Sequence, residues 1–502
     1  MKRGMTMQYC TPEQAGISSR QVKKFYNALA ARGLSTHSVI LARGNKIFSE
    51  CYYAPFNRNF KHRMYSVSKS FITAAVGFCV QDGLLSLDDK MTDYFPEYMN
   101  ESVDEITRSA TIRDMLHMHS AIEGFSKKWF YLKTDDRNKT YFSQSSQKYP
   151  NTLFTYDSSG SYMINVIVEK LTGKPFLQYL QEKVLNDIGF SKDAYCIQAP
   201  GGYSFGDSGV MCSAYDLLLY ARFIANRGAW NGKQYLDPAF MDEALDTSLF
   251  NRDDYGFVSH GAHGYGFLIW GAPRGGFAFL GMGNQIALYD PQHDFLFVIN
   301  SDNQGNQYGY EHIYAELYYQ IIDHLNDGTP LAEDAEGLAD LRALENSQKL
   351  FCLPHATTPE LAAHVAGKTY VCEQNPMGLK WFRLQLEGDT GIFAYENEQG
   401  TKEFPFGFGK NVFAKFPQTG YSDMVAGADC PGHTYDAAFS ADWCDANKLR
   451  IRVQIIDKYF GNLAIMLGFA DANHVTVRMS KTAEAFLDEY QGLTRAVAQQ
   501  EG

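Results

Sequence analysis

The sequence predicts an α/β (α+β) domain over residues 1–345, followed by a mostly β domain over residues 354–495. Strand-like runs lie at both ends of the first part, with helical stretches between them. This order is typical of helices packed on one sheet that the terminal segments share. Beyond Leu353, short β runs recur, and residues 449–455 alternate strictly between apolar and polar. That spacing predicts a small barrel or sandwich.

The elements of the first domain follow from local signals. Apolar runs at residues 37–43 and 46–53 flank Gly44 and Asn45, which tolerate positive φ and so predict a hairpin. Two more strands are expected at residues 284–289 and 295–300. Apolar periodicity and capping-box patterns predict helices at residues 18–31, 66–83 and 312–325, and from Thr111 and Ser213 onwards.

Three segments are interpreted from composition. Residues 126–150 are polar and aromatic without a clear period, which predicts a long surface loop or lid. Residues 326–350 are acidic and rich in alanine and leucine, which indicates a helical linker. A last helix is expected over residues 481–491.

Composition and charge exclude several classes of protein. The net charge of -12 argues against partners such as nucleic acid or an anionic membrane surface. The nine cysteines include no C-x-x-C pair, so we expect reduced, mostly buried thiols rather than disulfides or a zinc site. No apolar run follows Lys2 and Arg3, and no stretch approaches the ~20 apolar residues of a membrane helix. The expected location is the cytoplasm.

Ser66 and Lys69 form an S-x-x-K motif at the start of an apolar helical stretch. A serine hydroxyl is a weak nucleophile until a base takes its proton. Residues three apart share a helix face, so Lys69 can reach Ser66 Oγ. The helix start also presents backbone N–H groups to a developing oxyanion. The four residues alone favour a capped helix with a solvated lysine, so their context decides.

That context is a series of blocks in a recognisable order. Residues 111–120 read Thr-Ile-Arg-Asp-Met-Leu-His-Met-His-Ser, and residues 154–160 read Phe-Thr-Tyr-Asp-Ser-Ser-Gly. Further blocks lie at residues 82–97, 171–176 and 209–216. Together with the S-x-x-K motif they resemble the class C β-lactamase-like serine hydrolases, which include penicillin-binding-protein-like esterases, 6-aminohexanoate-oligomer hydrolases and D-aminopeptidases. The resemblance covers about the first 300 residues.

The resemblance implies a β-lactamase/transpeptidase-like fold, with an antiparallel sheet flanked by helices, and a C-terminal domain similar to the lipocalin-like domain of several members. It implies that Tyr156 is the second catalytic residue, passing a proton to the leaving group and then activating water. Ser158 stands where the family often has asparagine, and its hydroxyl is expected to bind substrate.

The third family motif aligns with Phe279, Leu280 and Gly281, which implies that the N–H of Met282 is the second oxyanion donor. The family's lysine or histidine is absent at Phe279. That departure disfavours a β-lactamase or a cell-wall peptidase, and favours an esterase, an amidase or an acyltransferase.

Two other patterns have plainer interpretations. His117 and His119 alternate on a helix and diverge, so no metal site is expected. Gly206-Asp-Ser-Gly209 imitates a protease motif but is interpreted as a turn.

The sequence therefore predicts a serine hydrolase that forms an acyl intermediate on Ser66 with a small ester or amide, and that needs no cofactor. An acyltransferase using the same intermediate and a non-catalytic receptor for acyl ligands remain as alternatives. The expected partner is a small-molecule acyl substrate, and homo-oligomerisation stays open.

Overall fold

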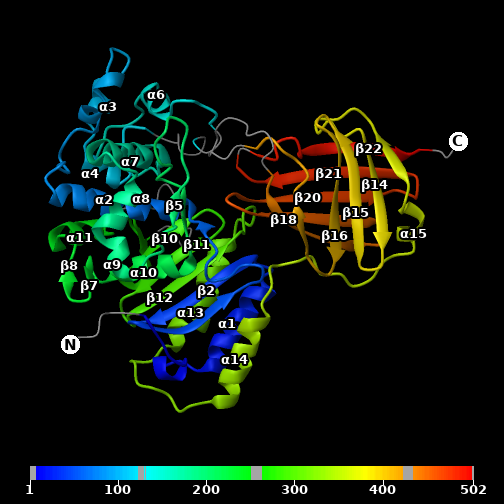
Figure 1. The fold of residues 1–502 in the computed structure, drawn as a ribbon, viewed down its shortest axis with the longest axis horizontal. Coiled ribbons are helices and arrows are strands. Elements are labelled where there is room, and N and C mark those ends of the chain that lie inside the picture. The colour runs from blue at the N-terminus through cyan, green and yellow to red at the C-terminus, as the bar shows by residue number, and fades with distance from the viewer. Residues whose placement is uncertain are drawn as a thin grey trace. The chain divides into compact units, whose positions relative to one another are not determined.

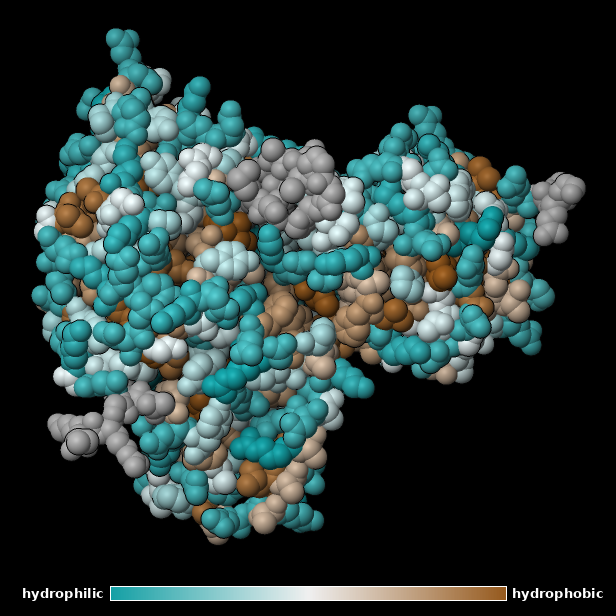
Figure 2. All heavy atoms as spheres, viewed as in Figure 1, coloured by the Kyte–Doolittle hydropathy of each residue, from teal (hydrophilic) through white to brown (hydrophobic). Residues whose placement is uncertain are grey.

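The computed structural model describes residues 7–122, 129, 132–249, 251, 263–421, 434–484 and 486–499. The chain divides into two units, residues 1–349 and 350–502, each of which has its own sheet (Figure 1). In the view of Figure 2, hydrophilic residues predominate on the visible face, in keeping with the strong net charge.

A seven-stranded sheet forms the middle of the first unit, in the order β1-β3-β2-β12-β11-β10-β9. All neighbouring strands are antiparallel except β1 and β3. The N-terminal hairpin pairs with the later strands through β2 and β12, so the prediction that terminal segments share one sheet is confirmed. The strands are β1 (Gln8–Tyr9), β2 (Thr36–Arg43), β3 (Lys46–Tyr52), β9 (Trp270–Ala272), β10 (Gly276–Gly281), β11 (Gln285–Asp290) and β12 (Phe295–Ser301).

Helices cover both faces of this sheet (Figure 1). On one face, Phe25 of α1 (Ser19–Ala31) packs edge-on against Phe297 of β12. On the other face, Tyr220 of α10 (Ala214–Ala225) contacts Phe279 of β10. Two more helices pack against α1: α13 (Gly309–Gln320) and α14 (Ala335–Ser347).

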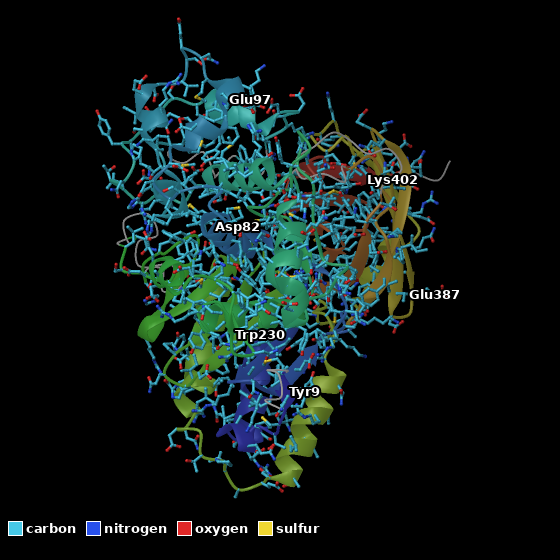
Figure 3. All side chains as sticks on the ribbon, turned by 60° about the vertical axis from the view of Figure 1, so that its left-hand side comes forward. Tyr9, Asp82, Glu97, Trp230, Glu387 and Lys402 are labelled. Atoms are coloured by element: carbon cyan, nitrogen blue, oxygen red, sulfur yellow. The ribbon has the colours of Figure 1, made fainter. Side chains whose placement is uncertain are left out.

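A second group of helices surrounds α2 (Ser68–Gln81), in which every residue from Ser68 to Cys79 is buried. Asp82 follows the last turn of α2 and accepts a 2.9 Å hydrogen bond from the Tyr179 hydroxyl of α8 (Phe176–Leu180) (Figure 3). Predicted capping boxes open α4 and α10 at Thr111 and Ser213. The other elements here are α3 (Glu105–Ser109), α4 (Ile112–Leu116), α6 (Arg137–Phe142), α7 (Ser158–Thr172), α9 (Asn186–Ile188), α11 (Pro238–Ala244), β4 (His62–Arg63), β5 (Tyr195–Cys196), β6 (Val210–Cys212), β7 (Ala229–Trp230) and β8 (Lys233–Gln234).

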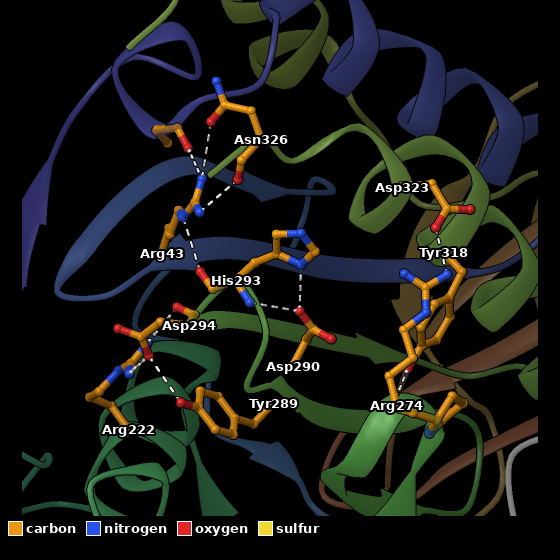
Figure 4. Close-up of polar contacts among 12 residues, drawn as sticks. Arg43, Arg222, Arg274, Tyr289, Asp290, His293, Asp294, Tyr318, Asp323 and Asn326 are labelled. Carbon is orange, nitrogen blue, oxygen red and sulfur yellow. Dashed lines mark hydrogen bonds and ion pairs between the residues drawn. The ribbon is translucent and has the colours of Figure 1, made fainter. Parts of the chain in front are cut away.

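Polar contacts fix the turn between β11 and β12 (Figure 4). His293 Nδ1 lies 2.7 Å from Asp290 Oδ2, and Arg43 Nε donates to the His293 carbonyl over 3.0 Å. Arg222 of α10 pairs with Asp294 at 2.5 Å. These contacts tie β2 and α10 to the β11–β12 turn.

The second unit is a closed barrel. Ten strands follow one another in the order β16-β15-β14-β13-β22-β21-β20-β19-β18-β17, and β16 also pairs with β18, so nine strands form a ring. Aromatic rings stack across the interior, from Phe382 to Phe393 to Phe404 to Phe439, with centroids 4.9–5.5 Å apart. The elements are α15 (Leu361–Val365), β13 (Thr369–Cys372), β14 (Trp381–Glu387), β15 (Thr390–Asn397), β16 (Gly400–Phe408), β17 (Val412–Lys415), β18 (Asp436–Asp445), β19 (Lys448–Ile456), β20 (Phe460–Phe469), β21 (His474–Thr482) and β22 (Gly492–Ala498).

Three expectations about local structure are wrong. Residues 483–491 contain turns instead of a last helix in their described part, because Leu487 has a left-handed φ of 60°. The helix expected within residues 326–350 is present as α14, but the segment is not a linker, since Ser49 of β3 donates a hydrogen bond to Glu345 of α14 within the first unit. The predicted loop at 126–150, part of which lies outside the described residues, contains the helix α6 with Tyr141 buried.

Two expectations from composition concern the thiols and the membrane. The eight cysteines in the described part of the chain are free, but only Cys51, Cys79 and Cys212 are buried, so the expectation of mostly buried thiols is wrong. Among the described residues, no helix combines the length and the apolar character needed to cross a lipid bilayer.

Candidate active site

Ser66 lies in a 3-10 turn, η2 (Tyr65–Val67), directly before α2. Lys69 is in the first turn of α2 with 1% of its surface exposed, and its Nζ donates a 3.0 Å hydrogen bond to Ser66 Oγ. Tyr65 has a positive φ of 47°, an uncommon backbone conformation for a bulky residue, and its ring lies 4.3 Å from the Arg63 guanidinium carbon. The i, i+3 pair predicted from the sequence is therefore in contact.

A turn at residues 206–209 is hydrogen-bonded to the start of α2. Lys69 Nζ donates to the Asp207 carbonyl over 2.8 Å. Arg63 Nε donates to the Ser208 carbonyl over 3.1 Å, and the Val210 N–H donates to Ser68 Oγ over 3.0 Å. A side chain at Gly209 would put its Cβ only 2.8 Å from the Phe205 carbonyl oxygen. The tight turn interpreted from the sequence is therefore confirmed, and it fixes Lys69.

Tyr156 lies in the loop just before α7, beside the Ser66–Lys69 pair. Its ring centroid is 5.1 Å from Lys69 Nζ. The ring stacks on Trp270 at 5.3 Å with an interplanar angle of 22°, and meets Tyr265 edge-on. Trp270 is buried, so this stacking fixes the plane of the Tyr156 ring next to the lysine.

The end of β10 forms a third wall. A side chain at Gly281 would put its Cβ 2.4 Å from the Met64 carbonyl oxygen, so only glycine allows this approach. Tyr310 donates its hydroxyl to the Gly281 carbonyl over 2.5 Å. The Gly281 C=O and the Met282 N–H belong to one trans peptide and point in opposite directions, so this bond also orients the Met282 N–H. Gln285 Nε2 donates to the Met282 carbonyl over 3.0 Å.

These walls enclose a pocket of about 150 Å³. Burial and the neighbouring Tyr156 raise the pKa of Tyr310, so its hydroxyl stays protonated and can donate. The residues that line the pocket are Ser66, Tyr156, Trp270, Leu280, Gly281, Met282 and Tyr310.

Two predicted site residues lie elsewhere. Phe279 is 2% exposed and packs on Tyr220 and Phe277, because successive side chains of a strand point to opposite faces. Leu280 lines the pocket in its place. Ser158 is fully buried at the start of α7 and is absent from the described lining of the pocket.

Sequence reasoning missed Asp207, Trp270, Gln285 and Tyr310. No local spacing links them to Ser66, and in a chain with 32 tyrosines a single tyrosine carries no signal. The glycines around Asp207 did mark a tight turn, but not its contact with Lys69.

Among the residues that the structure describes, no group of three or more His, Cys, Asp or Glu side chains is placed to hold a metal ion.

The chain is similar in sequence to known proteins. A family model described as beta-lactamase matches residues 22–320. A curated 6-aminohexanoate-dimer hydrolase from Paenarthrobacter ureafaciens is 24% identical over 284 residues, which cover 52% of this chain and 71% of the relative.

Two solved structures share the fold of the first unit. A provisionally named 6-aminohexanoate-dimer hydrolase from Bacillus anthracis has a TM-score of 0.53 at 19% identity, and the match covers 65% of this chain and 88% of the other. A penicillin-binding protein homologue from Caulobacter crescentus has a TM-score of 0.50 at 15% identity, covering 62% of this chain and 99% of the other.

The family match spans more than half of the chain and contains the Ser66 helix, Tyr156 and β10. The resemblance inferred from the sequence blocks is confirmed. The chain therefore belongs to the beta-lactamase family, a hydrolase family with the β-lactamase/transpeptidase fold.

Proposed function

We propose that this protein is a serine hydrolase that forms an acyl intermediate on Ser66 and releases the acyl group to water. The observation that carries the proposal is the 3.0 Å hydrogen bond between Lys69 Nζ and Ser66 Oγ, beside a pocket that Tyr156 also lines. A serine activated in this way needs a base within hydrogen-bond reach and donors for the oxyanion. The first unit offers candidates for both.

The proposed reaction has two stages. Ser66 Oγ bonds to the acyl carbon while its proton moves to Lys69 or Tyr156, and the carbonyl oxygen becomes an anion facing the N–H groups of Ser66 and Met282. The bond from the carbon to the alcohol or amine then breaks, and the leaving group takes this proton back through Tyr156. In the second stage water attacks the acyl-Ser66 ester and gives its proton to the same base; the bond to Ser66 Oγ breaks, the base returns the proton to Ser66, and the carboxylic acid leaves.

The pocket favours a small, uncharged acyl group. Its volume is about 150 Å³, and none of the described residues that line it carries a charged side chain. A carboxylate on the substrate would lose its hydration there without a cation to replace it. The relative named for hydrolysis of the 6-aminohexanoate dimer makes an amide as reasonable a substrate as an ester.

Intact-mass spectrometry after exposure to a fluorophosphonate tests the proposal. We expect one adduct on the wild type and none on Ser66→Ala. Ser70→Ala is the matched control, because Ser70 lies on the same helix and donates its hydroxyl only to the Val67 carbonyl over 2.8 Å in the described structure. An unlabelled but folded wild type, or equal labelling of Ser66→Ala, would refute an activated Ser66 and favour a receptor.

Turnover of p-nitrophenyl esters then tests the substrate class. We expect short neutral acyl groups, acetyl to butyryl, to react faster than the charged succinyl ester. Faster turnover of the succinyl ester would contradict an uncharged pocket.

A further inference from the structure

Gln285 is the first residue of β11, pairs with Gly281 of β10 and is fully buried. Its Nε2 donates to the Met282 carbonyl over 3.0 Å and to the Ser301 carbonyl over 2.6 Å. Its Oε1 accepts from Asn300 Nδ2 over 3.1 Å and from the Ser301 N–H over 3.2 Å. A primary amide has two N–H groups and two acceptor sites, so all four are used. The reversed amide would put its oxygen against two carbonyl oxygens, so these contacts fix the orientation of the side chain.

This amide belongs to a buried polar cluster that joins β2, β11 and β12. Asn300, the partner of Gln285, accepts the Ser38 hydroxyl over 3.1 Å, and its Nδ2 also lies 3.7 Å from Met64 Sδ. Met64 directly precedes the turn that contains Ser66. Buried hydrogen-bonded groups resist displacement, because a shift leaves polar atoms unpaired. The cluster therefore connects the segment before Ser66 to the turn after β10.

Met282 is held through both of the peptide groups that flank its α-carbon. The Tyr310 hydroxyl holds the preceding peptide through the Gly281 carbonyl, over 2.5 Å. Gln285 holds the following peptide through the Met282 carbonyl. Because each peptide group is planar, holding two successive planes fixes the φ and ψ angles between them. The direction of the Met282 N–H, the proposed second oxyanion donor, therefore depends on both side chains.

The rest of the β10–β11 turn has a different anchor. Ser301 Oγ lies 2.8 Å from the Gly283 carbonyl oxygen and 2.9 Å from the Asn284 carbonyl oxygen, and its hydroxyl donates to both. This hydroxyl holds the turn at its second and third residues, whereas the Gln285 amide holds it at Met282. The two anchors can therefore be removed separately.

We propose that Gln285 is a positioning residue that orients the Met282 N–H toward the oxyanion formed during acyl transfer. An oxyanion donor stabilises the transition state fully only when it already points at the position that the oxygen will occupy. Gln285 acts on the reaction through Met282, so its loss should lower kcat and leave KM nearly unchanged. The inference rests on the proposed function, because the same N–H serves the acylation of Ser66.

The first test is hydrolysis of p-nitrophenyl butyrate by Gln285→Met, which keeps the length of the side chain and removes the amide. We expect kcat to fall about tenfold with KM within about twofold of the wild type, a smaller loss than the ~10²–10³-fold that follows outright removal of an oxyanion donor. Gln285→Asn, in which the amide is one methylene shorter, should lower kcat in the same direction.

The second test is the coupling between Gln285 and Tyr310. Loss of either hydrogen bond frees one of the two peptide planes at Met282, so the second loss should add little. We expect the double variant, Gln285→Met with Tyr310→Phe, to lose no more than about threefold in kcat beyond the slower single variant. Two independent effects would multiply instead.

Two control variants separate positioning from general loosening of the first unit. Ser301→Ala removes the hydroxyl that holds the rest of the turn, and should lower kcat clearly less than Gln285→Met. Gln21→Met removes another buried glutamine amide of the same unit, whose Nε2 donates to Gln320 Oε1 over 2.8 Å. It should keep kcat within about twofold of the wild type.

Each outcome decides the proposal. A fall in kcat at constant KM in both Gln285 variants, with a double variant that loses little more, supports it. Multiplied losses, an equal loss in Ser301→Ala, an unchanged kcat, or unfolding of both Gln285 variants would overturn it, while wild-type turnover that depends on Ser66 still supports the proposed function. Ester turnover that survives in Ser66→Ala contradicts the proposed function as well.

Discussion

Among the residues that the structure describes, each unit buries one lysine, and the two lysines differ in what they bind. In the first unit Lys69 Nζ donates to a serine hydroxyl and to the Asp207 carbonyl. In the barrel Lys402 Nζ donates to the Asn397 side chain over 2.6 Å and to the Gly400 carbonyl over 3.3 Å (Figure 3). Neither lysine forms an ion pair with a carboxylate among the described residues.

Burial of a lysine is therefore not in itself a sign of a catalytic site. Lys402 joins two residues of the β15–β16 hairpin, and both of its partners are acceptors that cannot become nucleophiles. Lys69 shares a hydrogen bond with a hydroxyl that lines a pocket. A perturbed or buried charge points to function only where it meets a reactive group in a cavity.

Exchanging the two lysines for methionine should give the largest contrast. We expect Lys69→Met to lower kcat/KM for a p-nitrophenyl ester by about 10³-fold or more, because no other described side chain donates to Ser66 Oγ. Lys402→Met should stay within about twofold of the wild type. Steady-state kinetics of both variants make the comparison, and a similar loss in both would show that the barrel lysine is needed for activity.

The second contrast is in stability. Removing the charge of Asp207 should stabilise the first unit at pH 7, since burial raises the pKa of its carboxyl to about 6 in the folded state, against an ordinary 3.8. That difference corresponds to about 3 kcal/mol. Below about pH 4 the carboxyl is protonated in both states and the penalty is absent; it grows as the pH rises and is complete above about pH 6.

Urea unfolding of wild type and Asp207→Asn at pH 4 and pH 7, followed through the transition of the first unit, measures this penalty. We expect Asn to be the more stable variant at pH 7 and the two proteins to converge at pH 4. A variant less stable than wild type at pH 7 would mean that the cations around Asp207 need its charge for folding.

Ser66 and Asp207 show how much of the site could be predicted from the sequence. Ser66 and Lys69 could be predicted because their contact depends only on spacing within one helix. Tyr156 and Gly281 could be placed by family blocks. Asp207 could not, because its contact with Lys69 joins residues 138 apart in the chain.

Strand register and turn-like residues explain why the other features could not be predicted from the sequence. Phe279 and Leu280 are adjacent, and a shift of one residue moves a side chain to the opposite face, so an alignment uncertain by one residue cannot say which of them lines the pocket. In the barrel, the strand pattern was predictable for most strands, but β16 contains Gly400, Pro405 and Gly407, which imitate a loop. The mixture of polar and apolar residues after Thr482 resembles a helical pattern, which explains why a last helix was predicted there.

A smaller effect is expected at the peptide between Gly281 and Met282, whose N–H is the proposed oxyanion donor. Tyr310→Phe removes the 2.5 Å hydrogen bond to the Gly281 carbonyl and leaves the Met282 N–H less firmly oriented. We expect kcat to fall about tenfold with little change in KM, since the bond acts mainly when the oxyanion forms. Tyr314→Phe, one helical turn further along α13, is the matched control. Equal effects in both variants would indicate general loosening of α13 instead.

The smallest effect returns to Lys402. Burial lowers its pKa, so at neutral pH the folded barrel holds a charged amine at a cost, and above the folded pKa the amine becomes neutral and the cost is relieved. Stability of the second unit should therefore rise with pH until the unfolded lysine also loses its proton, at about pH 10.4. Lys402→Met lacks this group, and its stability relative to wild type should decrease between pH 7 and pH 10.

Urea unfolding of the barrel transition at both pH values measures the difference, with Lys410→Met as an exposed control that pairs only with Asp389 in the described structure. If the difference does not change with pH, the contacts with Asn397 and Gly400 compensate fully for burial, and the charged amine of Lys402 has the same free energy in the barrel as in water.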